Sequence, residues 1–153
     1  KPWKESHTSK HFHFRLYDMG EEVEEDNKKA FRYYRKAASF DHTYAMHNLS
    51  IMFDEGEGVS QNFERAHYYA KRGATLGNAD AQNNLGYDYL KGEGVSEDIL
   101  MAYIWFYAAS EQGNETAKEN FENARDALPF WQKKKAVKLA AACIESDYKT
   151  CGP

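Results

Sequence analysis

Residues 81–95 read AQNNLGYDYLKGEGV, and 36 positions earlier residues 45–59 read AMHNLSIMFDEGEGV. Both stretches begin with alanine, place asparagine and leucine three and four residues later, and end on the motif GEGV. The match extends outward to residues 30–65 and 66–101, and a third copy begins at Ala102 but lacks the glycine loop. Such a period is the signature of a repeat architecture. We therefore expect the chain to consist of similar units.

Each unit is predicted to contain two helices. Ala45, Leu49 and Phe53 recur at steps of four and form the apolar stripe of an α-helix, and the same stripe returns one period later. A second helix carries Ala66 and Tyr69, with small residues at 73 and 74 where a neighbouring helix must come close. Neither helix can bury its apolar side alone, so successive units must stack. The sequence predicts an all-α fold, a right-handed superhelix or solenoid.

The predicted solenoid fills residues 1–153 as a single domain. Its parts are a partial repeat at 7–29, repeats at 30–65 and 66–101, a terminal repeat at 102–127, and a capping helix with a tail at 128–153. The capping helix is expected to turn its lysines toward solvent: Lys133, Lys134, Lys135 and Lys138. A polar outer face of this kind is what the end of a solenoid requires.

The GEGV motif is predicted to join two helices. Gly56 and Gly92 are placed to end the first helix, because a residue without Cβ adopts the left-handed conformation easily. Ser60 and Ser96 are expected to cap the second helix, with the valine before each serine buried under the loop. A phosphate-binding loop would instead follow a strand, and here a glutamate stands where the anion would sit. We expect a structural joint rather than a ligand cradle.

The residues of the repeat resemble a known pattern. In residues 81–113 it is carried by Ala81, Asn84, Leu85, Gly86, Tyr89, Gly92, Gly94, Val95, Asp98, Ala102, Trp105, Ala108, Ala109 and Gly113. This pattern is similar to that of the Sel-one-like repeat (SLR) family, relatives of the tetratricopeptide repeat. Ser50 and Asp41 depart from it, since glycine is usual at both places. The resemblance implies that the first helix of each unit lines a concave, protein-binding face.

Partner-binding residues are predicted on this concave face, at positions of the first helices that stacking does not use. They combine aromatic and hydrogen-bonding side chains, which suit protein recognition: Thr8, His11, Phe12, Arg15, Tyr44, His47, Ile51, Asp54, Asp80, Asn83, Tyr87, Leu90, Glu119 and Asn123. Asparagines recur on the same side in every unit and are assigned instead to hydrogen bonds of the repeat itself: Asn48, Asn84 and Asn120.

Composition places the chain among ordinary globular proteins. The formal net charge is -4, with 29% charged and 42% hydrophobic residues, so no basic excess points to nucleic acid. No apolar run approaches the roughly 18 to 20 residues of a membrane span. Residue 1 is lysine rather than methionine, which favours a trimmed chain whose targeting segment is not part of the sequence shown.

Histidines are the residues that most invite a chemical role. His7, His11 and His13 could hold a metal, but no cysteine or second histidine pair completes a ligand set, so surface histidines are expected. The others fall on different helical faces, with no serine or cysteine placed for activation: His42, His47 and His67. We predict no metal, no cofactor and no catalytic residue.

The acidic run EEVEED at residues 21–26 is expected in a loop, with Val23 buried beneath it like the valine of GEGV. Its carboxylates form either a solvated surface or a negative patch that speeds docking of a basic partner.

Cys143 and Cys151 lie eight residues apart near the C-terminus. They are predicted to form a disulfide, which is more common in exported than in cytosolic proteins. The alternative is a buried free thiol at 143 and an exposed one at 151.

The function predicted from these features is a protein–protein interaction scaffold. The resemblance further implies a contact inhibitor, because small exported bacterial relatives often serve as immunity proteins that neutralise a secreted toxin. The expected location is the periplasm or another exported location of a bacterial cell. One alternative is a regulatory or assembly scaffold of the cell envelope. Another is a hydrolase acting on peptidoglycan, as proposed for cysteine-rich relatives, although this chain has no cysteines within its repeats.

Overall fold

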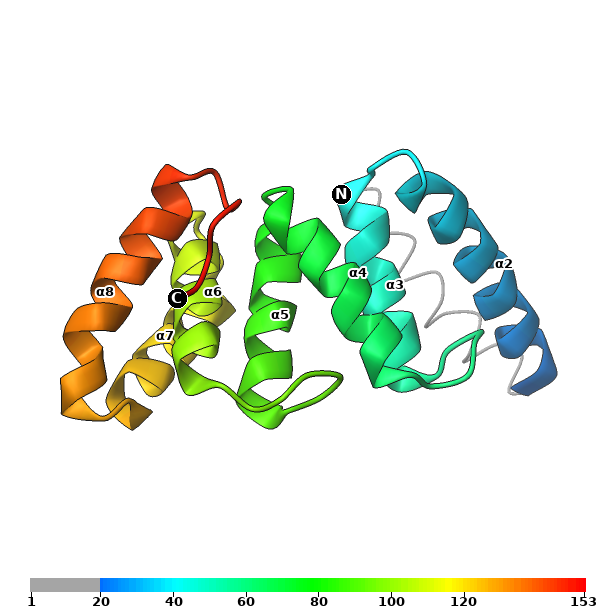
Figure 1. Ribbon diagram of the computed structural model, residues 1–153. Coiled ribbons are helices and arrows are strands. Elements are labelled where there is room, and N and C mark those ends of the chain that lie inside the picture. The colour runs from blue at the N-terminus through cyan, green and yellow to red at the C-terminus, as the bar shows by residue number, and fades with distance from the viewer. Residues whose placement is uncertain (1–19) are drawn as a thin grey trace.

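The computed structural model describes residues 20–153, with side chains from Glu24 onward. This part of the chain contains α-helices and no strand: α2 (Gly20–Ala38), α3 (Thr43–Glu55), α4 (Phe63–Thr75), α5 (Ala79–Lys91), α6 (Ile99–Glu111), α7 (Glu115–Ala127) and α8 (Phe130–Glu145). Figure 1 shows them side by side in one extended row, from α2 at one end to α8 at the other. The predicted all-α superhelical solenoid is confirmed.

The helices pack in sequence order, as stacked pairs require. α3 packs on α4 and α5 on α6, while α4 and α6 also contact the first helix of the following unit. The predicted stripe is buried, with Leu49 and its equivalent Leu85 both fully inaccessible. Burying one such side chain stabilises the fold by about 1.5–3 kcal/mol. The main core runs from α4 to α8, and a smaller cluster lies between α2 and α3.

The glycine loop is a joint made by two glycines with different tasks. Gly56 and Gly92 end α3 and α5 in the left-handed conformation, with φ of 72° and 71°, as predicted. At Gly58 and Gly94, a Cβ would overlap the backbone carbonyl of Asn27 and of Phe63, respectively. These carbonyls belong to the preceding second helices, α2 and α4, and they too lie one repeat apart. The loop can therefore rest on the preceding unit only if its second glycine has no side chain.

The helices after these loops begin later than predicted. Asn62 and Asp98, not Ser60 and Ser96, cap α4 and α6, and their side chains accept hydrogen bonds from the amides of Arg65 and Met101. A capping side chain must reach the amide three residues on, and the serines lie two residues too early. The valines of the loop are half-buried rather than fully buried.

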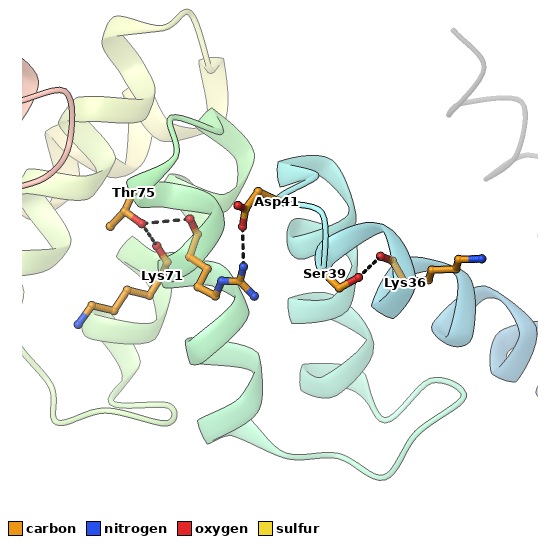
Figure 2. A network of polar contacts seen from close by, with 6 residues as sticks. Lys36, Ser39, Asp41, Lys71 and Thr75 are labelled. Carbon is orange, nitrogen blue, oxygen red and sulfur yellow. Dashed lines mark hydrogen bonds and ion pairs between the residues drawn. The ribbon is translucent and has the colours of Figure 1, made fainter.

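The turns between the second helix of one unit and the first helix of the next also need positive φ. Gly77 and Gly113 supply it at 93° and 86°, while Asp41 adopts 59° at the equivalent place. Aspartate tolerates this conformation better than most residues. Figure 2 shows the Asp41 carboxylate pointing toward α4, where Arg72 Nη2 lies 2.7 Å from Asp41 Oδ1. The aspartate therefore adds an ion pair that links this turn to α4.

The acidic run at residues 21–26 lies in helix α2, so the prediction of a loop was wrong. Glutamate favours helix formation, and this run contains no glycine pair to end a helix. Lys28 also forms an (i, i+4) ion pair with Glu24 at 2.9 Å. Val23 thus belongs to a helix, and the carboxylates of Glu24, Glu25 and Asp26 are exposed on it.

The C-terminal end is held by α8 and the predicted disulfide. α8 packs against α6, and Cys143 is bonded to Cys151, which confirms that prediction. The tail then folds back across α6 (Figure 1), where Gly152 lies against Met101. Within residues 20–153, no helix has the length and apolar character needed to cross a membrane.

Candidate protein-binding groove

The predicted binding positions lie on α3, α5 and α7, the first helices of the units. Thr8, His11, Phe12 and Arg15, like the histidines at 7 and 13, fall outside the described residues. Of the remaining positions, some make hydrogen bonds or ring contacts within the solenoid, some line an open hollow, and three do neither.

A ladder of hydrogen bonds connects each first helix to the next. Asn84 Nδ2 lies 3.3 Å from His47 Nδ1 and donates to Ser50 Oγ at 3.4 Å. One repeat later, Asn120 donates to Asn83 Oδ1 at 3.0 Å and accepts from Tyr87 OH at 3.2 Å. The assignment of these asparagines to the repeat itself is confirmed, and three predicted partner residues turn out to be their bonding partners.

Two further predicted residues also make contacts within the solenoid. Asp80 Oδ1 accepts a hydrogen bond from Asn114 Nδ2 at 2.9 Å. Tyr44 packs edge-on against Tyr34 and His42, and burial raises the pKa of its hydroxyl to about 12. These contacts link neighbouring helices of the solenoid.

A hollow of about 420 Å³ opens where the C-terminal ends of α3 and α5 meet the N-terminal part of α4. It contains three predicted binding residues, Ile51, Asp54 and Tyr87. The rest of its lining is Ser50, Glu55, Ala66, Asn84, Asp88, Lys91 and Glu93. Asp88, Lys91 and Glu93 were not among the predicted positions, because the helical face of a residue does not indicate how closely the helix ends converge.

The hollow is predominantly acidic. Four carboxylates line it, against the single ammonium of Lys91, which lies 5.6 Å from the centre of the Tyr87 ring. Burial raises the pKa of Asp88 above 3.8, and the carboxylates of Asp54 and Glu93 add to the increase. Mutual repulsion of this kind favours a positively charged group in the hollow.

His67 of α4 counteracts the effect of burial on Asp88. Its Nδ1 lies 3.0 Å from Asp88 Oδ2, and this hydrogen bond lowers the pKa of Asp88 in part. The His67 ring also packs edge-on against Tyr89. The pair links α4 to α5 through Asp88, which lines the hollow. No sequence motif signals it, because the two residues are 21 positions apart on different helices.

The other predicted residues lie away from this hollow. Leu90 is half-buried and packs on the main core, while Glu119 and Asn123 are exposed on α7. In the described part of the chain, no group of three or more histidine, cysteine or carboxylate side chains is arranged to hold a metal ion.

The repeats of this chain match the profile of a known family. A profile described as Sel1 repeat matches residues 12–39, 43–78 and 79–114. The chain belongs to the Sel1 repeat family. Sel1 repeat proteins are scaffolds for protein–protein interaction, and their fold is typically not that of an enzyme.

Solved structures of SLR proteins have the same architecture. One is a protective antigen present in uropathogenic Escherichia coli strains, with a TM-score of 0.79 and 30% identity over 91% of this chain. The match covers only 30% of that longer chain. A Sel1 repeat protein from Oxalobacter formigenes has a TM-score of 0.58 and 35% identity, covering 60% of this chain and 69% of its own. Among curated proteins, none matches the sequence significantly.

Proposed function

We propose that this Sel1 repeat chain is a contact inhibitor, an immunity protein that binds a secreted bacterial toxin in its groove. The observation that carries the proposal is the acidic hollow between α3 and α5. A side chain entering it meets the apolar surface of Ile51 and the ring of Tyr87, surrounded by carboxylates. Arginine or lysine at the end of a protruding segment of the partner fits such a site, because its apolar stem can pack on Ile51 and Tyr87 while its positive charge pairs with the carboxylates.

The rigidity of the groove also supports inhibition by contact. The ladder from His47 to Asn120 holds successive first helices in one register, so little conformational freedom remains to be lost on binding. A preorganised surface retains more of its interaction free energy as affinity. Tight binding at the partner's functional surface is sufficient to block a toxin without any chemistry in the inhibitor.

The proposed location is the periplasm. The Cys143–Cys151 disulfide fits an oxidising compartment. The bond holds the C-terminal tail across α6, and a reducing compartment would break the bond and release the tail. A toxin that acts on the cell envelope would meet its inhibitor in the same compartment.

The test begins by capturing partners from the secreted and envelope fractions of the native cell with the tagged chain. Each captured protein is then purified, and its toxicity and binding are measured with and without the chain. The proposal predicts a one-to-one complex that abolishes toxicity. Asp54→Lys should weaken both binding and protection, because it adds a positive charge to the hollow. Glu111→Lys on α6, the same charge change at an exposed position outside the hollow, serves as the matched control.

The alternative is a regulatory or assembly scaffold of the envelope. It predicts a captured partner whose activity is unchanged by binding, with the same sensitivity to Asp54→Lys. That result would retain the groove as the binding surface and reject inhibition.

A further inference from the structure

Helix α8 carries an apolar stripe that the described part of the chain leaves uncovered. Phe130 and Val137 are 82% and 60% exposed, Ala141 is exposed, and Ile144 is half-buried. Their spacings of seven, four and three residues place all four on one side of the helix. Ala136, Ala140 and Cys143 form a separate, fully buried stripe against α6. The exposed stripe is thus an additional surface and not the edge of the core.

The geometry of this stripe suits another helix. Helices α4 and α6 each pack between two first helices, α4 between α3 and α5 and α6 between α5 and α7. α8 is the last helix of the row (Figure 1) and packs chiefly against α6. The small side chain of Ala141 between Val137 and Ile144 permits close approach of a helix backbone, as ridge-and-groove packing needs.

The charge around the stripe defines the partner further. α8 contains four lysines and a single glutamate at its last position. Lys133 and Lys134 lie one turn after Phe130, and Lys138 follows Val137 directly, so ammonium groups border the stripe on both sides. Two α8 helices would bring these lysines together, which disfavours self-association through this face. Acidic side chains bordering an apolar stripe would be complementary.

We propose that the outer face of α8 is a second protein-binding site that takes an acidic amphipathic helix of a partner. Apolar residues of that helix cover Phe130, Val137 and Ala141, and its flanking carboxylates pair with the lysines. This is the helix-in-groove mode of recognition. The site is separate from the acidic hollow and does not depend on the proposed inhibitory function, so a chain with both surfaces can bring two proteins together.

The test uses a defined probe rather than an unknown partner. A labelled synthetic helix as long as α8, with a leucine stripe and flanking glutamates, is titrated with the whole disulfide-bonded chain and followed by fluorescence anisotropy. A matched probe carries lysines in place of the glutamates. The acidic probe should bind about tenfold or more tightly than the basic probe, with affinity falling as salt rises.

Two variants of α8 locate the binding. Val137→Glu places a carboxylate in the stripe and should weaken binding of the acidic probe about tenfold or more. Ala142→Glu adds the same charge at an exposed position outside the stripe and should weaken it much less. Circular dichroism checks that both variants keep the helical content of the parent, which is expected because both positions are exposed.

Equal binding of the two probes, or equal effects of the two variants, overturns the proposal. A basic helix with exposed aromatic residues can also lie on an anionic membrane. Vesicles of equal parts phosphatidylglycerol and phosphatidylcholine are therefore tested in parallel. If the chain binds these vesicles, Val137→Glu weakens that binding, and the chain does not bind the acidic probe, then the surface binds lipid and the protein-binding proposal is wrong.

Discussion

Replacing Gly94 with alanine tests whether the repeated glycine loop is a joint between units. Gly94 has φ of 70°, and a Cβ there would overlap the carbonyl group of Phe63 and lie 2.9 Å from His67 Cβ. Gly113 has φ of 86°, yet nothing lies within 4 Å of a Cβ placed on it. Both glycines therefore adopt a positive φ that disfavours a side chain, but only Gly94 also lacks space for a Cβ.

The expected magnitudes follow from this difference. Alanine in the left-handed conformation costs about 1–2 kcal/mol, and its lower freedom in the unfolded chain offsets about 0.4–1 kcal/mol. Gly113→Ala should therefore destabilise the protein by at most about 1.6 kcal/mol. Gly94→Ala adds the cost of overpacking, about 1–3 kcal/mol, because the obstructing atoms belong to a helix backbone that cannot rotate away.

Urea unfolding followed by circular dichroism measures the difference. With ordinary slopes, Gly94→Ala should unfold at a urea concentration lower than Gly113→Ala by about 1 M. Gly58→Ala, which meets the carbonyl of Asn27 in the same way, should behave like Gly94→Ala. Identical midpoints for Gly94→Ala and Gly113→Ala would refute the idea that the second glycine is required for contact between units.

Three further outcomes are expected. Cys151→Ser should lower the free energy of unfolding by about 2–3 kcal/mol through loss of the short disulfide loop, and dithiothreitol should reproduce this loss in the parent chain without adding to it in the variant. Asn120→Ala should cost about 1–3 kcal/mol because it removes the hydrogen bonds to Asn83 and Tyr87, whereas the exposed neighbour Glu119→Ala should change stability by less than about 0.5 kcal/mol; equal losses would contradict the ladder. Burial lowers the pKa of His47 from 6.5, so the unfolded chain binds more protons and stability is lost as pH falls below 6.5 toward the folded pKa. His47→Gln should flatten that slope in unfolding measured against pH, and an unchanged slope would show that His47 is not its source.

The repeat made most of the fold predictable. Leu49 and Leu85 mark the buried stripe in sequence as clearly as in the structure, and Gly56 and Gly92 end their helices where expected. The same pattern returns every 36 residues, so a helix or turn predicted in one unit can be checked against its copy in the next. The helix caps were predicted wrongly. A cap depends on whether one side chain reaches one backbone amide, and Asn62 does so at the start of α4 where Ser60 was predicted.

The candidate site was only partly predictable, because helical periodicity gives the direction of a side chain but not its neighbours. Ile51, Asp54 and Tyr87 do line one hollow. His47 and Asn83 face the same side but bond to asparagines of the next unit. The His67–Asp88 pair, and the close contacts that Gly58 and Gly94 make with the preceding helices, arise where separate helices stack. The residue pattern of one helix does not show which residues of another helix it will meet.

Hydrogen–deuterium exchange on the chain with and without a captured partner tests the central claim most directly. Since the solenoid is proposed to bind through the hollow between α3 and α5, backbone amides in residues 50–55 and 84–93 should exchange more slowly in the complex. Amides of α2, which lies beyond α3 from this hollow, should be unaffected. Protection confined to α2, with residues 50–55 and 84–93 unchanged, would contradict the account.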